Sequence, residues 1–191
     1  DTNPAANCYQ CGLSARRNKV VYGDGPNPAL GAIVGEAPGQ SENLYGRPFV
    51  GASGKLLREG LSSIGLDIPT EVYITNLVKC WPGHDAKGKQ LAPNAEEIRT
   101  CTSLYLKGQL NAATPTLILA IGALAAKWLC GKALASSANQ PWPGIGPAEG
   151  YAVIPLYHPA AVLRNRKKWG LTWEKGLKAV GRYLFPPPPS E

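Results

Sequence analysis

The pattern of apolar and polar positions along the chain predicts a small number of strands. Four short runs are apolar almost throughout, which is typical of strands buried on both faces. They occupy residues 29–35, 72–75, 116–121 and 151–157. Because helical segments separate these runs, the strands are expected to pair in parallel.

Apolar residues recur at helical spacing in the segments between and after the strands. These patterns predict helices at residues 53–64, 94–110, 123–134, 160–168 and 172–185, the last two separated at Gly170. Strands that alternate with helices in this way predict an α/β fold, in which helices cover both faces of the sheet.

No repeat and no linker divides the chain, so residues 1–185 are expected to form a single domain. Its first 28 residues are rich in Asn, Gly and Pro and predict irregular structure, and residues 81–93 and 141–150 predict loops. The Pro-rich segment 186–191 is expected to form a tail outside the domain.

Polar residues stand at the ends of three predicted strands. Glu36, Asn76 and His158 each follow an apolar run directly. Ligands of parallel α/β sheets bind beyond the carboxyl ends of the strands. The three side chains are therefore candidates for one binding site.

The charge of the chain is compatible with a polyanionic partner. The formal net charge is +7, and Arg164, Arg166, Lys167 and Lys168 lie within five positions. A basic protein with no nucleic-acid partner would look similar, so charge alone leaves both readings open. No apolar run is long enough to span a bilayer and no signal peptide precedes the first strand, so a cytoplasmic protein without membrane contact is expected.

Five cysteines without a secretory signal argue against a disulfide framework. Cys8 and Cys11 form a C-x-x-C pair, whereas Cys80 and Cys101 stand apart from each other. This spacing is unlike the two close pairs of most zinc sites. Four thiolates can also hold an iron–sulfur cluster. Cys130 lies in an apolar helix and reads as a core residue.

The segment after the first strand is built for close approach of a ligand to the backbone. Gly35, Glu36, Ala37, Pro38 and Gly39 place two glycines and a proline at the strand end. No Gly-Lys-Ser/Thr follows, which excludes a Walker loop. Further on, Phe49 can be read either as a platform for a flat base or as a core aromatic side chain.

Taken together, the motifs resemble those of the family-four uracil-DNA glycosylases, which are iron–sulfur enzymes. The resemblance rests on GEAPGxxE, GRPFVGxxG, ITN followed by KC, and HPAAVLR, in this order, and extends from Cys8 to about Tyr183. It implies a three-layer αβα sandwich around a four-stranded parallel sheet. It also implies a monofunctional DNA repair enzyme that flips uracil out of DNA, hydrolyses its N-glycosidic bond and leaves an abasic site.

The resemblance implies roles for the residues of the pocket. Phe49 would stack on the extruded uracil, and Gly35, Glu36 and Ala37 would surround it. Asn76 would pair with the pyrimidine edge, because an amide offers a donor and an acceptor together. His158 would bond to uracil O2 and stabilise charge on the leaving base.

Two positions bear on how water is activated. Glu42 is a second carboxylate near the pocket, which in the family restricts the entry of thymine or assists water. Ala37 stands where the best-known branch of the superfamily has an aspartate base. If the bond breaks before water attacks, stabilisation of the leaving uracil anion supplies much of the catalysis and weakly activated water suffices.

The resemblance also implies a structural 4Fe–4S cluster on Cys8, Cys11, Cys80 and Cys101. The gap between the last two cysteines is longer than is usual in the family, so the loop at residues 81–93 looks enlarged.

Residues that follow His158 would contact the DNA. Val162 or Leu163 is the candidate for a wedge that enters the duplex, and Arg164 and Arg166 would hold phosphates. The only partner expected is uracil-containing DNA, and the protein is expected to act as a monomer.

Two rivals remain. One is a relative that becomes covalently trapped on the abasic sugar through a loop histidine, here His84, although the Arg-rich stretch that precedes that histidine is missing. The other is a protein that binds uracil or damaged DNA without turnover, a reading that Ala37 keeps open.

Overall fold

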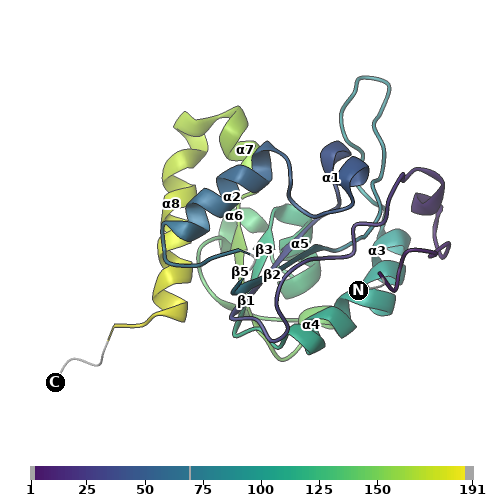
Figure 1. Cartoon of the computed structure of the whole chain (residues 1–191). Coiled ribbons are helices and arrows are strands. Elements are labelled where there is room, and N and C mark those ends of the chain that lie inside the picture. The colour runs from purple at the N-terminus through teal and green to yellow at the C-terminus, as the bar shows by residue number, and fades with distance from the viewer. Residues whose placement is uncertain (1–2, 69, 188–191) are drawn as a thin grey trace.

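The computed structural model describes residues 3–68 and 70–187 and shows a central sheet with helices on both faces (Figure 1). The strand order is β2-β1-β3-β5-β4. The strands are β1 (Gly31–Gly35), β2 (Val72–Asn76), β3 (Leu117–Ile121), β4 (Trp142–Pro143) and β5 (Ala152–Leu156). All four predicted strands and the α/β class are thereby confirmed. Residues 188–191 of the predicted tail lie outside the described residues.

The sheet contains one strand more than expected. Strands β2, β1, β3 and β5 pair in parallel, as predicted, and β4 adds an antiparallel strand at the edge next to β5. It lies inside the segment 141–150, which was expected to be a loop. A strand of two residues is too short to produce a periodic pattern, so the sequence does not reveal it.

The α-helices are α1 (Gln40–Tyr45), α2 (Ala52–Ser62), α3 (Ala95–Cys101), α4 (Lys107–Ala113), α5 (Ala123–Cys130), α6 (Leu134–Ser137), α7 (Pro159–Arg164) and α8 (Arg166–Leu184). A π-helical turn (Thr102–Leu106) joins α3 to α4, and short 3-10 helices lie at Gly12–Ala15 and Gly146–Ala148.

The predicted break at Gly170 is wrong, because the helix ends and restarts at Asn165. Asn165 leaves helical geometry (φ −151°, ψ 79°), and its side-chain oxygen accepts from the backbone N–H of Lys168 at 2.9 Å. This cap satisfies a free N–H of α8, so α8 runs through Gly170. Helix α5 ends earlier than predicted, since Gly131 adopts a left-handed conformation (φ +68°) after Cys130.

Alternating residues of the strands face opposite layers. Ile33 of β1 packs with Leu57 of α2 and Trp173 of α8 in one cluster. Its neighbours Ala32 and Val34 belong to the other cluster, with the helices α3, α4 and α5. The sheet is therefore covered on both faces, and only the ends of its strands are left for a site.

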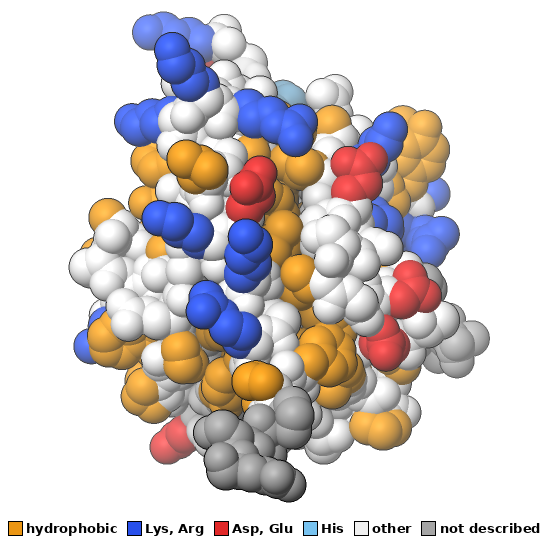
Figure 2. Space-filling model, turned by 90° about the vertical axis from the view of Figure 1, so that its left-hand side faces the viewer, with side chains coloured by type: hydrophobic (Ala, Val, Ile, Leu, Met, Phe, Trp, Pro, Cys, Tyr) orange, Lys and Arg blue, Asp and Glu red, His pale blue; other side chains and the backbone are white. Residues whose placement is uncertain are grey.

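Helix α8 presents basic side chains to solvent. Figure 2 shows Lys and Arg side chains spread over the face that carries α8. Those of α7 and α8 that are exposed are Arg164, Arg166, Lys167, Lys168, Lys175, Lys178 and Arg182. Within the described part of the chain, no helix combines the length and the apolar character needed to cross a bilayer.

Candidate active site and cysteine pocket

A cleft of about 520 Å³ opens at the carboxyl ends of the parallel strands. Glu36 follows β1, Asn76 ends β2 and His158 follows β5, and all three line the cleft. Phe49 and Glu42 complete its wall. The structure thus brings together the three strand-end residues that the sequence singled out.

Gly35 lets the two recognition side chains meet. It pairs with Asn76 in the register of β1 and β2. A Cβ atom at Gly35 would collide with Asn76 Oδ1 and would lie 2.8 Å from Phe49 Cζ. Only glycine therefore allows the Asn76 amide and the Phe49 ring to approach the same point of the backbone.

Phe49 is held in a strained conformation. Its φ of +52° lies in the left-handed region, which is rare for an aromatic residue. Its carbonyl oxygen accepts from Arg58 Nη1 at 2.6 Å and lies where a Cβ at Gly54 would collide with it. The ring is 6% exposed and faces the imidazole of His158 at 6.2 Å between centroids.

His158 is a neutral hydrogen-bond donor in this site. Burial, with the nearby charge of Arg164, lowers the pKa of His158 to about 4, against an opposing effect of Glu42. Its Nδ1 accepts from the backbone N–H of Ala160 at 3.1 Å, at the start of α7. The proton of the neutral ring therefore sits on Nε2, which is free to donate.

The two carboxylates of the cleft differ in their surroundings. Glu42 Oε2 accepts from the backbone N–H of Gly39 and Oε1 from that of Gly51, both at 3.0 Å. Glu42 thereby joins the loop after β1 to the loop before α2. Burial raises the pKa of Glu36, whose side chain is half-buried in the cleft. Ala37 lines the cleft beside it and adds no polar group.

The candidate DNA-contacting residues differ in how far their side chains are exposed to solvent. Val162 is 2% exposed and belongs to the core cluster beneath α7, whereas Leu163 is 51% exposed. Of these two side chains, only that of Leu163 is accessible to a partner. Arg164 lines the mouth of the cleft, and Arg166 is exposed at the start of α8.

The enlarged loop forms a hairpin that reaches the cleft. His84 bridges to Gln90, and Asp85 Oδ1 accepts from the backbone N–H groups of Lys87 and Lys89 at 2.9 Å each. Lys89 and Gln90 line the cleft. His84 is absent from that lining, and its ring packs edge-on against Trp81 at 5.0 Å.

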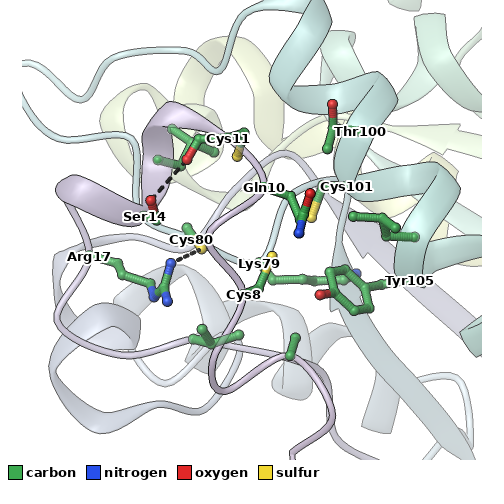
Figure 3. A pocket seen from close by; sticks show the side chains of 14 residues that line it. Cys8, Gln10, Cys11, Ser14, Arg17, Lys79, Cys80, Thr100, Cys101 and Tyr105 are labelled. Carbon is green, nitrogen blue, oxygen red and sulfur yellow. Dashed lines mark hydrogen bonds between the residues drawn. The ribbon is translucent and has the colours of Figure 1, made fainter.

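A second pocket lies on the side of α3 (Figure 3). Four of the 14 residues that line it are cysteines. Cys8 and Cys11 come from the N-terminal segment, Cys80 from the turn after β2 and Cys101 from the end of α3. None of the four is in a disulfide. Cys130 lies outside this pocket in the core, as predicted, where its Sγ contacts the carbonyl of Ala126.

Burial raises the pKa of three of these thiols, Cys11, Cys80 and Cys101. It raises the pKa of Cys80 to about 11, although Arg17 Nη1 lies 3.6 Å from the sulfur and opposes the shift. Burial also raises the pKa of Cys101, and Lys79 opposes it. In residues 3–68 and 70–187, no three Cys, His, Asp or Glu side chains gather tightly enough for one metal ion.

Sequence reasoning missed Lys79, Lys89 and Gln90. A lysine between the apolar Val78 and the candidate ligand Cys80 is a signal that could have been used. Lys89 and Gln90 reach the cleft only through the path of the hairpin, which no local pattern predicts.

Residues 22–180 match the Uracil DNA glycosylase superfamily. The chain is 37% identical over 180 residues to the Type-4 uracil-DNA glycosylase of Archaeoglobus fulgidus, which covers 91% of this chain and 86% of the relative. It is 39% identical over 165 residues to that of Pyrobaculum aerophilum (83% and 81%) and 37% identical over 162 residues to that of Thermotoga maritima (83% and 79%).

Proposed function

This chain belongs to the Uracil DNA glycosylase superfamily, and we propose that it excises uracil from DNA by hydrolysing the N-glycosidic bond, leaving an abasic site. The observation that carries the proposal is the meeting of Asn76, Phe49 and His158 in one cleft at the strand ends. An aromatic face, an amide and a neutral imidazole are the groups that a flipped uracil requires.

Asn76 supports recognition of uracil. Its side chain is in a nearly closed environment, at 2% exposure, beside the Phe49 ring. An amide whose NH2 faces O4 and whose oxygen faces N3–H satisfies the uracil edge. Cytosine presents the reverse pattern, and unpaired groups in such a site cost about 1–3 kcal/mol each.

His158 supports departure of the base. Nε2–H can donate to uracil O2, where negative charge grows as the bond breaks. Because the ring is neutral, it stabilises this charge by a hydrogen bond and remains neutral afterwards. Ala37 provides no base, so we propose that bond breaking leads and that water, held near the half-buried Glu36, attacks an oxocarbenium-like sugar. The proton that this water loses neutralises the uracil anion. Glu42 shapes the mouth of the cleft through its two backbone partners.

We propose that the cysteine pocket holds a 4Fe–4S cluster on Cys8, Cys11, Cys80 and Cys101. The donor set fits, because four free thiols from three segments surround one pocket and the basic side chains Lys79 and Arg17 line it too. When bound, the cluster supplies a cross-link of the N-terminal segment to the turn after β2 and to α3, and takes no part in hydrolysis.

DNA is proposed to lie across the mouth of the cleft. Leu163, which is exposed, is the candidate wedge, and Arg164 and Arg166 are candidates for phosphate contacts beside it. We expect a monomer to suffice, since every proposed site residue comes from this chain.

One experiment separates this function from its rivals. The protein is incubated with single- and double-stranded oligonucleotides that carry one uracil or, as the control, thymine. A strand break that appears only with uracil and only after alkali supports hydrolysis without lyase activity. A protein–DNA band that survives denaturation would indicate covalent trapping, and an intact strand in a bound complex would indicate a binder without turnover.

A further inference from the structure

Lys79 is a buried lysine whose purpose the proposed reaction does not explain. Its side chain is 1% exposed, although a lysine can normally extend its ammonium to water. Burying a charge is costly unless partners offset it. Among residues 3–68 and 70–187, the ion pairs join Arg47 to Asp24 and Lys55 to Glu59, so no carboxylate pairs with Lys79.

On one side, Lys79 contacts the end of the strand β2. Lys79 Nζ donates to the hydroxyl of Thr75 at 2.7 Å and to the backbone carbonyl of Asn76 at 2.6 Å. The Thr75 hydroxyl in turn donates to the carbonyl of Tyr22 at 2.8 Å. The ammonium therefore fixes the peptide of the residue whose side chain faces the uracil cleft.

On its other side, Lys79 borders the cysteine pocket. Lys79 lines it together with Cys80 and Cys101 (Figure 3). Cys101 lies near Lys79, whose charge opposes the effect of burial on the pKa of Cys101. Cysteine thiolates that hold a metal centre would supply negative charge on this side of Lys79.

We propose that Lys79 is a positioning residue, which uses the negative charge of the occupied cysteine pocket to hold the Asn76 peptide, and with it the Asn76 amide, in register with uracil. The proposal rests on the proposed uracil excision and on a metal centre held by the four cysteines. The metal centre would then influence base recognition electrostatically, in addition to cross-linking the chain. The influence would pass through Lys79 to Asn76, which lies 3 residues earlier in the chain.

The test compares Lys79→Met and Lys79→Gln, which are neutral, with Lys79→Arg, which keeps the charge. Lys87→Met, an exposed lysine outside both pockets, is the matched control. All proteins are purified anaerobically with their metal. For each, we would measure iron content, the reduction potential of the centre, and single-turnover excision of uracil at varied enzyme concentration.

We expect the neutral variants to keep iron and DNA affinity while the saturating single-turnover rate falls about 10- to 100-fold, as misplacement of a recognition group does. Their centre should also become harder to reduce, because a nearby positive charge is gone. Lys79→Arg should restore the potential, and Lys87→Met should match the wild type in every respect.

Wild-type saturating rates in an iron-loaded neutral variant would overturn the proposal, and so would an unchanged reduction potential. If the neutral variants lose iron, Lys79→Arg decides: retained iron supports the need for charge, and equal loss overturns it. Failure of the wild type itself to excise uracil would instead count against the proposed function, which keeps the two failures distinguishable.

Discussion

At the scale of single residues, His158 shows how a local hydrogen bond determines a chemical role. The backbone N–H of Ala160 occupies Nδ1, so the neutral ring can only donate through Nε2. His158→Gln should therefore lower the saturating single-turnover rate by about 10²- to 10³-fold, the effect of losing one donor to a developing anion. DNA affinity, measured by fluorescence anisotropy, should stay within a few-fold. A variant rate close to the wild type would remove His158 from leaving-group stabilisation.

The lowered pKa of His158 also predicts a dependence of stability on pH. The unfolded chain takes up a proton on this histidine near its ordinary pKa of 6.5, whereas the folded protein does so only near 4. Within this window the unfolded state binds more protons, so the free energy of unfolding contributed by His158 falls as the pH is lowered. Denaturant titrations between pH 7 and pH 4 should therefore show a smaller decline for His158→Gln than for the wild type.

The wild type and His158→Gln must be compared because the titration of Glu36 changes the free energy of unfolding in the opposite direction. Its raised pKa makes the folded state bind a proton more readily than the unfolded state, so it adds stability as the pH falls. Glu36 is present in both proteins, and the difference between their curves isolates His158. Parallel curves would show that the histidine titrates normally.

The Asn76 amide leads to a prediction about which base the protein excises. Asn76→Asp should lose activity on uracil and gain a trace on unpaired cytosine, because a carboxyl can accept from the cytosine amino group. Asn76→Ala should lose uracil activity without that gain. Single-turnover cleavage of matched oligonucleotides checks both, and iron content confirms that each variant is loaded. Wild-type uracil rates in Asn76→Ala would remove this residue from recognition.

At the scale of elements, the apolar runs were sufficient to predict the four parallel strands, and thus the edge at which the site lies. Helix boundaries were harder to predict from the sequence. Asn165 caps α8, and this cap outweighs the weak tendency of Gly170 to end a helix. The six-residue α1 and the two-residue β4 are too short to leave a periodic pattern. The site residues at strand ends followed from chain order, whereas Lys89 and Gln90 depend on a fold of the hairpin that only tertiary contacts specify.

The hairpin at residues 84–90 carries a prediction of its own. Lys89 lines the cleft, whereas Lys87 is exposed on the same hairpin and does not line it. If Lys89 contacts a phosphate beside the flipped nucleotide, Lys89→Gln should weaken DNA binding at low salt and reduce the slope of log affinity against log salt by about 1. Lys87→Gln should leave both nearly unchanged. Equal behaviour of the two variants would place the hairpin away from the DNA.

At the scale of the whole molecule, the cysteine pocket brings the N-terminal segment together with the turn after β2 and the end of α3. Anaerobically purified protein should be brown and contain iron, and Cys130→Ser should leave the iron content unchanged, because Cys130 lies in the core away from the pocket. Cys8→Ser should reduce the iron and expose the first part of the chain to limited proteolysis. Metal analysis that finds zinc, or no metal, would contradict the assignment of the cluster.

The strained backbone at Phe49 has a consequence for the thermodynamics of the whole enzyme. Since Arg58 and the close approach of Gly54 hold its carbonyl, the ring is placed when the chain folds and need not be ordered again when a base arrives. The conformational entropy lost in fixing this ring is therefore part of the free energy of folding, and it is not lost again each time a base binds. A search along DNA, in which many nucleotides are sampled for each uracil found, favours a receptor that is already rigid at every trial.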